Sequence, residues 1–136
     1  MKVIRPLIII LTIAAMVNLF NGCNNDKEDP APTQAELLIG TWQFTNGVVS
    51  ECTDPLDNYT ETCTTECETI VVTSSTVTML GDSYPYTING NNLSINMGSG
   101  LTLTVNFVVS GSTLTITLKD SAEDGNCKYV SNYKKI

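Results

Sequence analysis

Cysteine is the residue type in this sequence whose chemistry and spacing are most informative. The chain of 136 residues contains five cysteines and no histidine. Four of the five form an even set in the body of the chain, which predicts two disulfides in a compartment where thiols oxidise. These four are Cys52, Cys63, Cys67 and Cys127. Their spacing alone leaves three pairings open.

A zinc site is the alternative for these thiols. Structural zinc sites use two closely spaced pairs of ligands, and Cys63 with Cys67 would supply one pair. The sequence has no second pair of this kind and no histidine. The acidic segment 51–68 also lacks the regular oxygen-ligand spacing, with glycine at the turn, of calcium loops. We therefore expect no metal and no cofactor.

Acidic pairs are the remaining candidates for catalysis, because histidine is the commonest general base. Asp54 with Asp57, and Glu66 with Glu68, could in principle act as the acid and base of a glycosidase. Both pairs fall in a polar segment that we interpret as a loop, where carboxylates are solvated. The sequence also contains no phosphate-binding loop, dinucleotide fingerprint or nucleophile elbow. We expect that the protein is not an enzyme.

The charge of the chain excludes another class of function. The formal net charge is −7, and without Lys2 and Arg5 five basic residues remain against 14 acidic ones, a net charge of −9. No lysine or arginine lies between Glu28 and Leu118. Binding of nucleic acids draws most of its free energy from basic residues against phosphates, so we expect no nucleic acid partner. The acidic surface is expected to keep a monomer soluble.

The N-terminal segment has the order of an export signal: basic residues, an apolar stretch and a small residue before a cysteine. The basic residues are Lys2 and Arg5, and the apolar stretch runs over 6–20. This stretch is shorter than the roughly 20 residues that a helix needs to cross a bilayer, which disfavours the alternative of a retained transmembrane anchor.

Gly22 and Cys23 resemble the lipobox of bacterial lipoproteins, in which the cysteine receives diacylglycerol before cleavage. The resemblance implies that residues 1–22 are a signal peptide and that Cys23 becomes a lipidated N-terminus carrying palmitate-type chains. Stable anchoring needs more than one acyl chain, and a processed lipoprotein cysteine carries several. The protein is then held on the outer membrane of the cell envelope, with residues 23–34 as a polar tether.

The rest of the sequence predicts an all-β domain. Thr33 and Glu36 have capping-box spacing, which predicts one helical turn over 33–39 that Gly40 ends. From Thr41 onward apolar residues alternate with polar ones, the period of β-strands. We expect eight strands, near 41–49, 68–73, 76–80, 84–88, 93–95, 101–107, 114–118 and 128–133. Tight turns are predicted at 89–91, at 98–100 and at Ser110–Gly111.

Eight short antiparallel strands fit either a closed up-and-down β-barrel or a β-sandwich, and periodicity does not separate them. Gly40, Thr41 and Trp42 resemble the Gly-x-Trp signature at the first strand of lipocalins. Segments 86–95 (YTINGNNLSI) and 109–117 (VSGSTLTIT) look like bacterial lipocalin-like lipoprotein domains. The resemblance implies a lipocalin-like (calycin-type) antiparallel barrel over 35–136, with Trp42 as a plug at its bottom. The arginine that often packs on this tryptophan in lipocalins has no counterpart here.

Closure of the strands in order would bring the first and last strands together. The end of the first strand would then lie beside the start of the last, so Cys52 would approach Cys127. Cys63 would be left to pair with Cys67, as a staple in the loop between the first two strands.

These inferences lead to one functional expectation and one alternative. We expect a membrane-anchored lipoprotein that binds a small apolar or amphipathic ligand, with segment 48–67 as a lid over the barrel mouth. The ligand-binding residues are not identifiable from the sequence. The alternative is a structural or interaction protein of the envelope with a filled barrel. A cavity on the order of 300 Å³ or more separates the two.

Overall fold

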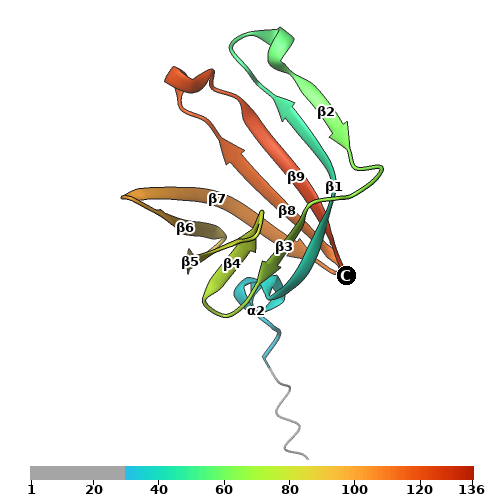
Figure 1. Ribbon diagram of the computed structural model, residues 1–136, viewed down its shortest axis with the longest axis vertical. Helices are drawn as coiled ribbons and strands as arrows, with labels where there is room; N and C mark the ends of the chain where they lie inside the picture. The colour runs from blue at the N-terminus through green and yellow to red at the C-terminus, as the bar shows by residue number, and fades with distance from the viewer. Residues whose placement is uncertain (1–29) are drawn as a thin grey trace, which may run out of the picture. The chain divides into compact units, whose positions relative to one another are not determined.

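The computed structural model describes residues 30–136, and these fold into the antiparallel β-structure of Figure 1. The predicted signal peptide, Cys23 and most of the predicted tether lie outside the described residues. One short helix, nine strands and two 3₁₀ turns follow in chain order: α2 (Gln34–Leu38), β1 (Gly40–Ser50), η1 (Pro55–Asp57), β2 (Tyr59–Thr62), β3 (Thr69–Val72), β4 (Thr76–Met79), β5 (Asp82–Asn89), β6 (Asn92–Gly98), β7 (Leu101–Ser110), β8 (Thr113–Lys119), η2 (Ala122–Asp124) and β9 (Lys128–Lys135).

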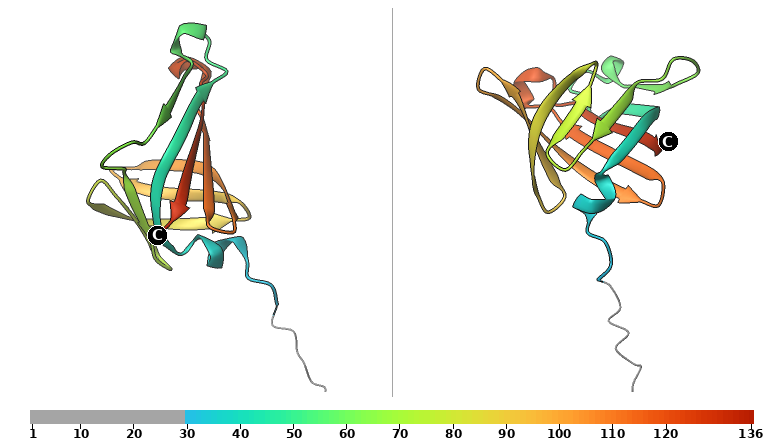
Figure 2. Two further views of the ribbon diagram at one scale, coloured as in Figure 1. Left: turned by 90° about the vertical axis from the view of Figure 1, so that its right-hand side faces the viewer. Right: turned by 60° about the horizontal axis from the view of Figure 1, so that its bottom comes forward.

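Eight of the strands form a closed barrel. Strands β3 to β9 pair antiparallel with their neighbours in sequence order, and β1 pairs with both β3 and β9. The closing ladder between β1 and β9 runs from Trp42 opposite Lys135 to Ser50 opposite Lys128. The ring can be followed in Figure 2. The predicted antiparallel up-and-down barrel is therefore confirmed, and the sandwich alternative is wrong.

Strand β1 has three partners because it is longer than the strands beside it. Its residues Gly40–Gln43 pair with β3, and its residues Asn46–Val49 pair with β2. A register shift between Phe44 and Asn46 separates the two parts, as a β-bulge does when it bends a strand and increases its twist. Strand β2 is thus a ninth strand outside the ring, in a segment that the sequence analysis assigned to a loop.

The core lies inside the ring, because alternate side chains along the barrel strands point inward. In β7 the buried Val105, Phe107 and Val109 alternate with exposed neighbours, the period that identified this strand. Leu101 departs from the prediction, because it is 63% exposed and the inward series begins at Leu103. The register of β6 and β7 shifts beside Gly98, which pairs with Leu101.

The turns between strands match the predicted glycine positions closely. Gly90 and Gly111 have φ values of +60° and +58°, a left-handed conformation that glycine adopts at little cost. Ser110 pairs with Thr113, so the tight loop consists of Gly111 and Ser112, one residue later than predicted.

Helix α2 covers one end of the barrel. The predicted capping box is present: Glu36 N donates to Thr33 Oγ1 (3.3 Å), and Thr33 N donates to Glu36 Oε2 (2.7 Å). The hydrogen bond from Thr33 N, followed by one that Thr33 Oγ1 donates to Glu36 Oε2 (2.9 Å), lowers the pKa of the Glu36 carboxyl. Gln34 Nε2 donates to Val109 O (3.1 Å) and Val109 N donates to Gln34 Oε1 (2.7 Å). The Gln34 amide thus fastens the helix to the end of β7.

Candidate ligand-binding cavity

A cavity of about 270 Å³ lies inside the barrel. Its wall is almost entirely aliphatic, built from the inward side chains of the barrel strands together with Leu38 of α2. Small-molecule sites are typically of about 300–1,000 Å³, so this cavity is slightly smaller than the lower end of that range. The apolar lining residues are Leu38, Ile70, Val72, Val77, Met79, Leu93, Ile95, Leu103, Val105, Leu114, Ile116 and Leu118.

The closed end of the barrel is filled by large side chains. Trp42 and Phe107 are completely buried and do not line the cavity. Trp42 Nε1 donates a hydrogen bond to Leu38 O (2.8 Å), which satisfies the indole in the core. Trp42 therefore lies where a plug at the barrel bottom was expected.

A lysine contacts this tryptophan where the lipocalin resemblance implied an arginine. Lys135 Nζ lies 5.1 Å from the centroid of the Trp42 ring. It also donates to Ile39 O (2.9 Å) and Leu37 O (3.4 Å), the carbonyls where α2 ends. Lys135 could not be identified from the sequence. The residue type expected beside this tryptophan was arginine, and Lys135 lies opposite Trp42 only because the barrel closes.

The polar part of the cavity wall, which we call the mouth, consists of Glu68, Tyr129, Ser131 and Tyr133. Glu68 precedes β3 and shares the inward face of Ile70 and Val72, two and four residues later. The other three alternate along β9 and point inward. The tyrosine ring of Tyr133 also packs edge-to-face on Phe44, with centroids 5.6 Å apart.

The surroundings of the two mouth tyrosines, Tyr129 and Tyr133, disfavour the ionised form of their phenol groups. Burial, followed by the charges of Glu68 and Glu61, raises the pKa of Tyr133 to about 12. A hydrogen bond with Asp120 is the main cause that raises the pKa of Tyr129, with smaller contributions from burial and from the charge of Asp120. The carboxylates of Glu68, Glu61 and Asp120 are among the charged groups that act on these two tyrosines.

The four acids considered as catalytic pairs lie in the segment between β1 and β3. Asp54 accepts a hydrogen bond from Leu56 N (2.9 Å) and caps η1, which contains Asp57. Glu66 is exposed in the connection between β2 and β3, and of these four acids Glu68 alone lines the cavity. Within residues 30–136, no group of three or more histidine, cysteine or acidic side chains is placed to hold a metal ion.

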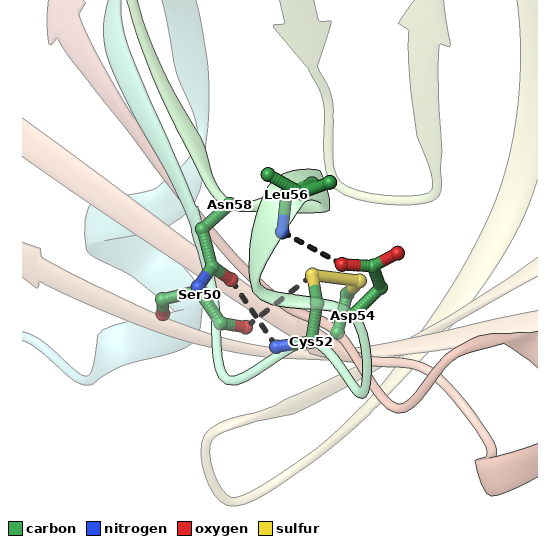
Figure 3. Close-up of a disulfide and its surroundings, with 6 residues drawn as sticks. Ser50, Cys52, Asp54, Leu56 and Asn58 are labelled. Carbon is green, nitrogen blue, oxygen red and sulfur yellow. Dashed lines mark hydrogen bonds between the residues drawn. A yellow bond between two sulfur atoms is a disulfide. The ribbon is translucent and has the colours of Figure 1, made fainter.

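The four cysteines of the domain form the disulfides Cys52–Cys127 and Cys63–Cys67. This is the pairing that barrel closure predicted. Cys52–Cys127 joins the segment after β1 to the residue before β9, where Thr53 N also donates to Gly125 O (2.8 Å). Figure 3 shows this disulfide beside η1, with Asn58 accepting a hydrogen bond from Cys52 N (3.2 Å).

Segment 48–67 is not a lid. It completes β1, forms η1 and returns as β2 along the outer part of β1. None of its residues lines the cavity. The hydrogen bonds of β2 to β1 hold the segment against the wall of the barrel, so the expectation of a lid over the mouth is wrong.

Comparison with other proteins adds no relative: no family model, no curated protein and no solved structure matches the chain. The closed eight-stranded antiparallel barrel is compatible with a calycin-like fold. In the part of the chain that the structure describes, no helix is long and apolar enough to span a bilayer.

Proposed function

We propose that this protein is a lipid-anchored lipoprotein of the cell envelope whose barrel binds a small apolar or amphipathic molecule. The observation that carries the proposal is the aliphatic cavity inside the ring, which Leu38 of α2 helps to line and which has polar groups in one part of its wall. Burial of apolar ligand surface in such a site contributes roughly 25 cal/mol per Å². The proposed role is binding by a monomer, without catalysis.

The proposed anchoring rests on the N-terminal sequence. Basic residues, an apolar stretch and Gly22–Cys23 follow one another in the order of a lipoprotein signal. An anchor on Cys23 would hold the barrel beside the membrane, where apolar and amphipathic molecules are concentrated.

Filling the cavity tests the binding proposal. Leu103→Trp places a large ring among the lining side chains, whereas Val108→Trp places the same ring on the outer face of β7, where Val108 is exposed. We expect the parent and Val108→Trp to bind the neutral fluorophore N-phenylnaphthylamine, and Leu103→Trp to bind it at least about tenfold more weakly. Native mass spectrometry of protein purified from its own membrane should show a bound small molecule that Leu103→Trp lacks. Equal fluorophore binding by all three proteins would contradict a cavity site.

One observation favours the alternative, a role in contacting another envelope protein. Leu56 is 91% exposed, and Tyr59 begins the exposed strand β2, whose outer edge has no strand partner among the described residues. Exposed apolar side chains at an open strand edge are features of contact sites. A photocrosslinking residue at position 56 that forms a protein adduct in cells, when one at Leu80, which is 86% exposed, does not, would favour this alternative.

A further inference from the structure

The mouth of the cavity contains a hydroxyl group that the fold leaves without a partner. The Tyr133 side chain is 8% exposed and lines the cavity. No hydrogen bond joins its hydroxyl to another of the described residues, and no side-chain oxygen or nitrogen among them is both fully buried and unpaired. The Tyr133 hydroxyl therefore remains accessible from the cavity and free to bind a polar group of a ligand.

The charges of two carboxylates, Glu68 and Glu61, act on this hydroxyl. Glu68 lines the cavity itself. Glu61 reaches the same region from β2: its Oε1 lies 2.9 Å from the point where a Cβ on Gly47 would be, and the Phe44 ring lies 3.3 Å from that point. Phe44 in turn packs on Tyr133. The absence of a side chain at Gly47 leaves the room in which the Glu61 carboxylate sits.

Three of the four described lysines are engaged away from these carboxylates. Lys119 and Lys128 lie 3.7 and 3.3 Å from the Glu51 carboxylate, and these are the ion pairs found within residues 30–136. Lys135 is held at the closed end, over Trp42. No lysine lines the cavity. The mouth therefore combines an apolar interior, an unpaired hydroxyl and carboxylates without a cationic partner in the described part of the chain.

We propose, on the basis of the binding role above, that the cavity takes an amphipathic cation, whose apolar chain lies inside the barrel and whose primary ammonium group binds Glu68 and the Tyr133 hydroxyl at the mouth. An ammonium group has three donors and no acceptor, so it can satisfy a carboxylate and a phenolic oxygen together.

Other head groups match the mouth less well. A carboxylate head group would meet the like charges of Glu68 and Glu61, which oppose its binding. A neutral alcohol can hydrogen-bond to Tyr133 but forms no charge-assisted bond, and such bonds are roughly twice as strong as neutral ones. From these contacts we expect a ligand with an ammonium head group to bind most tightly, one with an alcohol head group less tightly, and one with a carboxylate head group least tightly.

Three probes with the same alkyl chain test this order: octylammonium, octanol and octanoate. They are titrated by calorimetry at neutral pH into the full chain purified from its membrane and held in amphipol, and Leu103→Trp in the same medium serves as the blank for partitioning. We expect octylammonium to bind about tenfold more tightly than octanol, and octanoate about tenfold more weakly than octanol.

Variants then assign the preference to the mouth. Glu68→Gln should weaken octylammonium binding about tenfold and leave octanol within about twofold. Glu66→Gln is the matched control, because it removes the same charge from the same connection at a residue that does not line the cavity, and it should leave both affinities within about twofold. Tyr133→Phe should weaken octylammonium binding about threefold.

The outcomes separate this inference from the binding proposal. If octanol binds to the cavity but octylammonium binds no more tightly, the cationic preference is overturned and apolar binding stands. If Glu66→Gln weakens octylammonium binding as much as Glu68→Gln does, net charge rather than the mouth is responsible, and the inference is again overturned. If no probe binds the parent more tightly than Leu103→Trp, both proposals fail.

Discussion

Lys135 lies over the Trp42 ring, with its ammonium nitrogen 5.1 Å from the ring centroid, and binds two carbonyls of the segment that leads into β1. The two residues are also opposite each other in the ladder that closes the barrel. One side chain thus joins three parts of the closed end: the helix terminus, the single tryptophan and the last strand. The cation–π contact and the two hydrogen bonds each depend on the ring being closed.

We expect Lys135→Met to lower the free energy of unfolding by about 1–2 kcal/mol, because it removes the cation–π contact and both hydrogen bonds but retains an apolar stem. Urea unfolding followed by the fluorescence of Trp42 measures this. Lys135→Arg, which keeps the charge, should lose less than about half of that amount. Equal stability of Lys135→Met and the parent would show that the contact contributes nothing.

The two disulfides should differ in what they contribute. Cys52–Cys127 joins residues 75 positions apart, and Cys63–Cys67 joins residues four positions apart. Loop-closure entropy then predicts losses of about 4 kcal/mol for Cys52→Ala with Cys127→Ala, and about 2 kcal/mol for Cys63→Ala with Cys67→Ala. Urea unfolding of the two double variants checks the order. A larger loss for the short loop would contradict it.

Tyr133 should make the fold sensitive to alkali. Its pKa rises from 10.0 to about 12 in the folded protein, so the folded state holds the phenolic proton more tightly than the unfolded state does. The resulting stabilisation, about 2–3 kcal/mol, is fully present below pH 10 and is lost as the pH rises through 12.

Tyr133→Phe cannot ionise, so its free energy of unfolding should fall less than that of the parent between pH 10 and pH 12. Tyr129 and Tyr86, whose pKa values are also raised, should leave a residual decline in both proteins. Urea midpoints measured across this range give the comparison. Parallel declines in the parent and the variant would assign the alkaline sensitivity to other groups.

Lipidation is expected at Cys23 and nowhere else. Cys23→Ser should abolish labelling with palmitate and leave residues 1–22 attached, which intact-mass measurement detects. Cys63→Ala with Cys67→Ala also removes thiols but should keep both the labelling and the cleavage. A Cys23→Ser protein that is still cleaved and still labelled would contradict the proposed anchor.

The fold could be predicted where one face of a strand is buried. Leu114, Ile116 and Leu118 alternate with threonines, and this alternation placed β8 correctly. Strand β2 was not predicted, because all four of its residues are exposed and its sequence YTET has no apolar face. It is a strand only because β1 extends past β3 and offers its edge.

The candidate site was less predictable than the fold. Glu66 and Glu68 look equivalent as loop acids, yet Glu68 alone lines the cavity. Both are an even number of residues before Ile70 and Val72, but Glu68 directly precedes β3, and this position next to the strand is the sequence feature that could have separated the two. The approach of Glu61 to Phe44 and Tyr133 could not be read from spacing, since it depends on the register of β2 against β1.

The ladder between β1 and β9 also sets the order in which the domain can assemble. Its contacts join the first strand to the last, so nearly the whole polypeptide must be present before the ring can form. Contacts of such high sequence separation make folding slow. A chain truncated before Lys128 would expose the hydrogen-bonding edges of both β1 and β8 to other chains. Strand β9 must therefore be synthesised before this domain can become a single cooperative unit, and a nascent chain that lacks it stays open in the meantime.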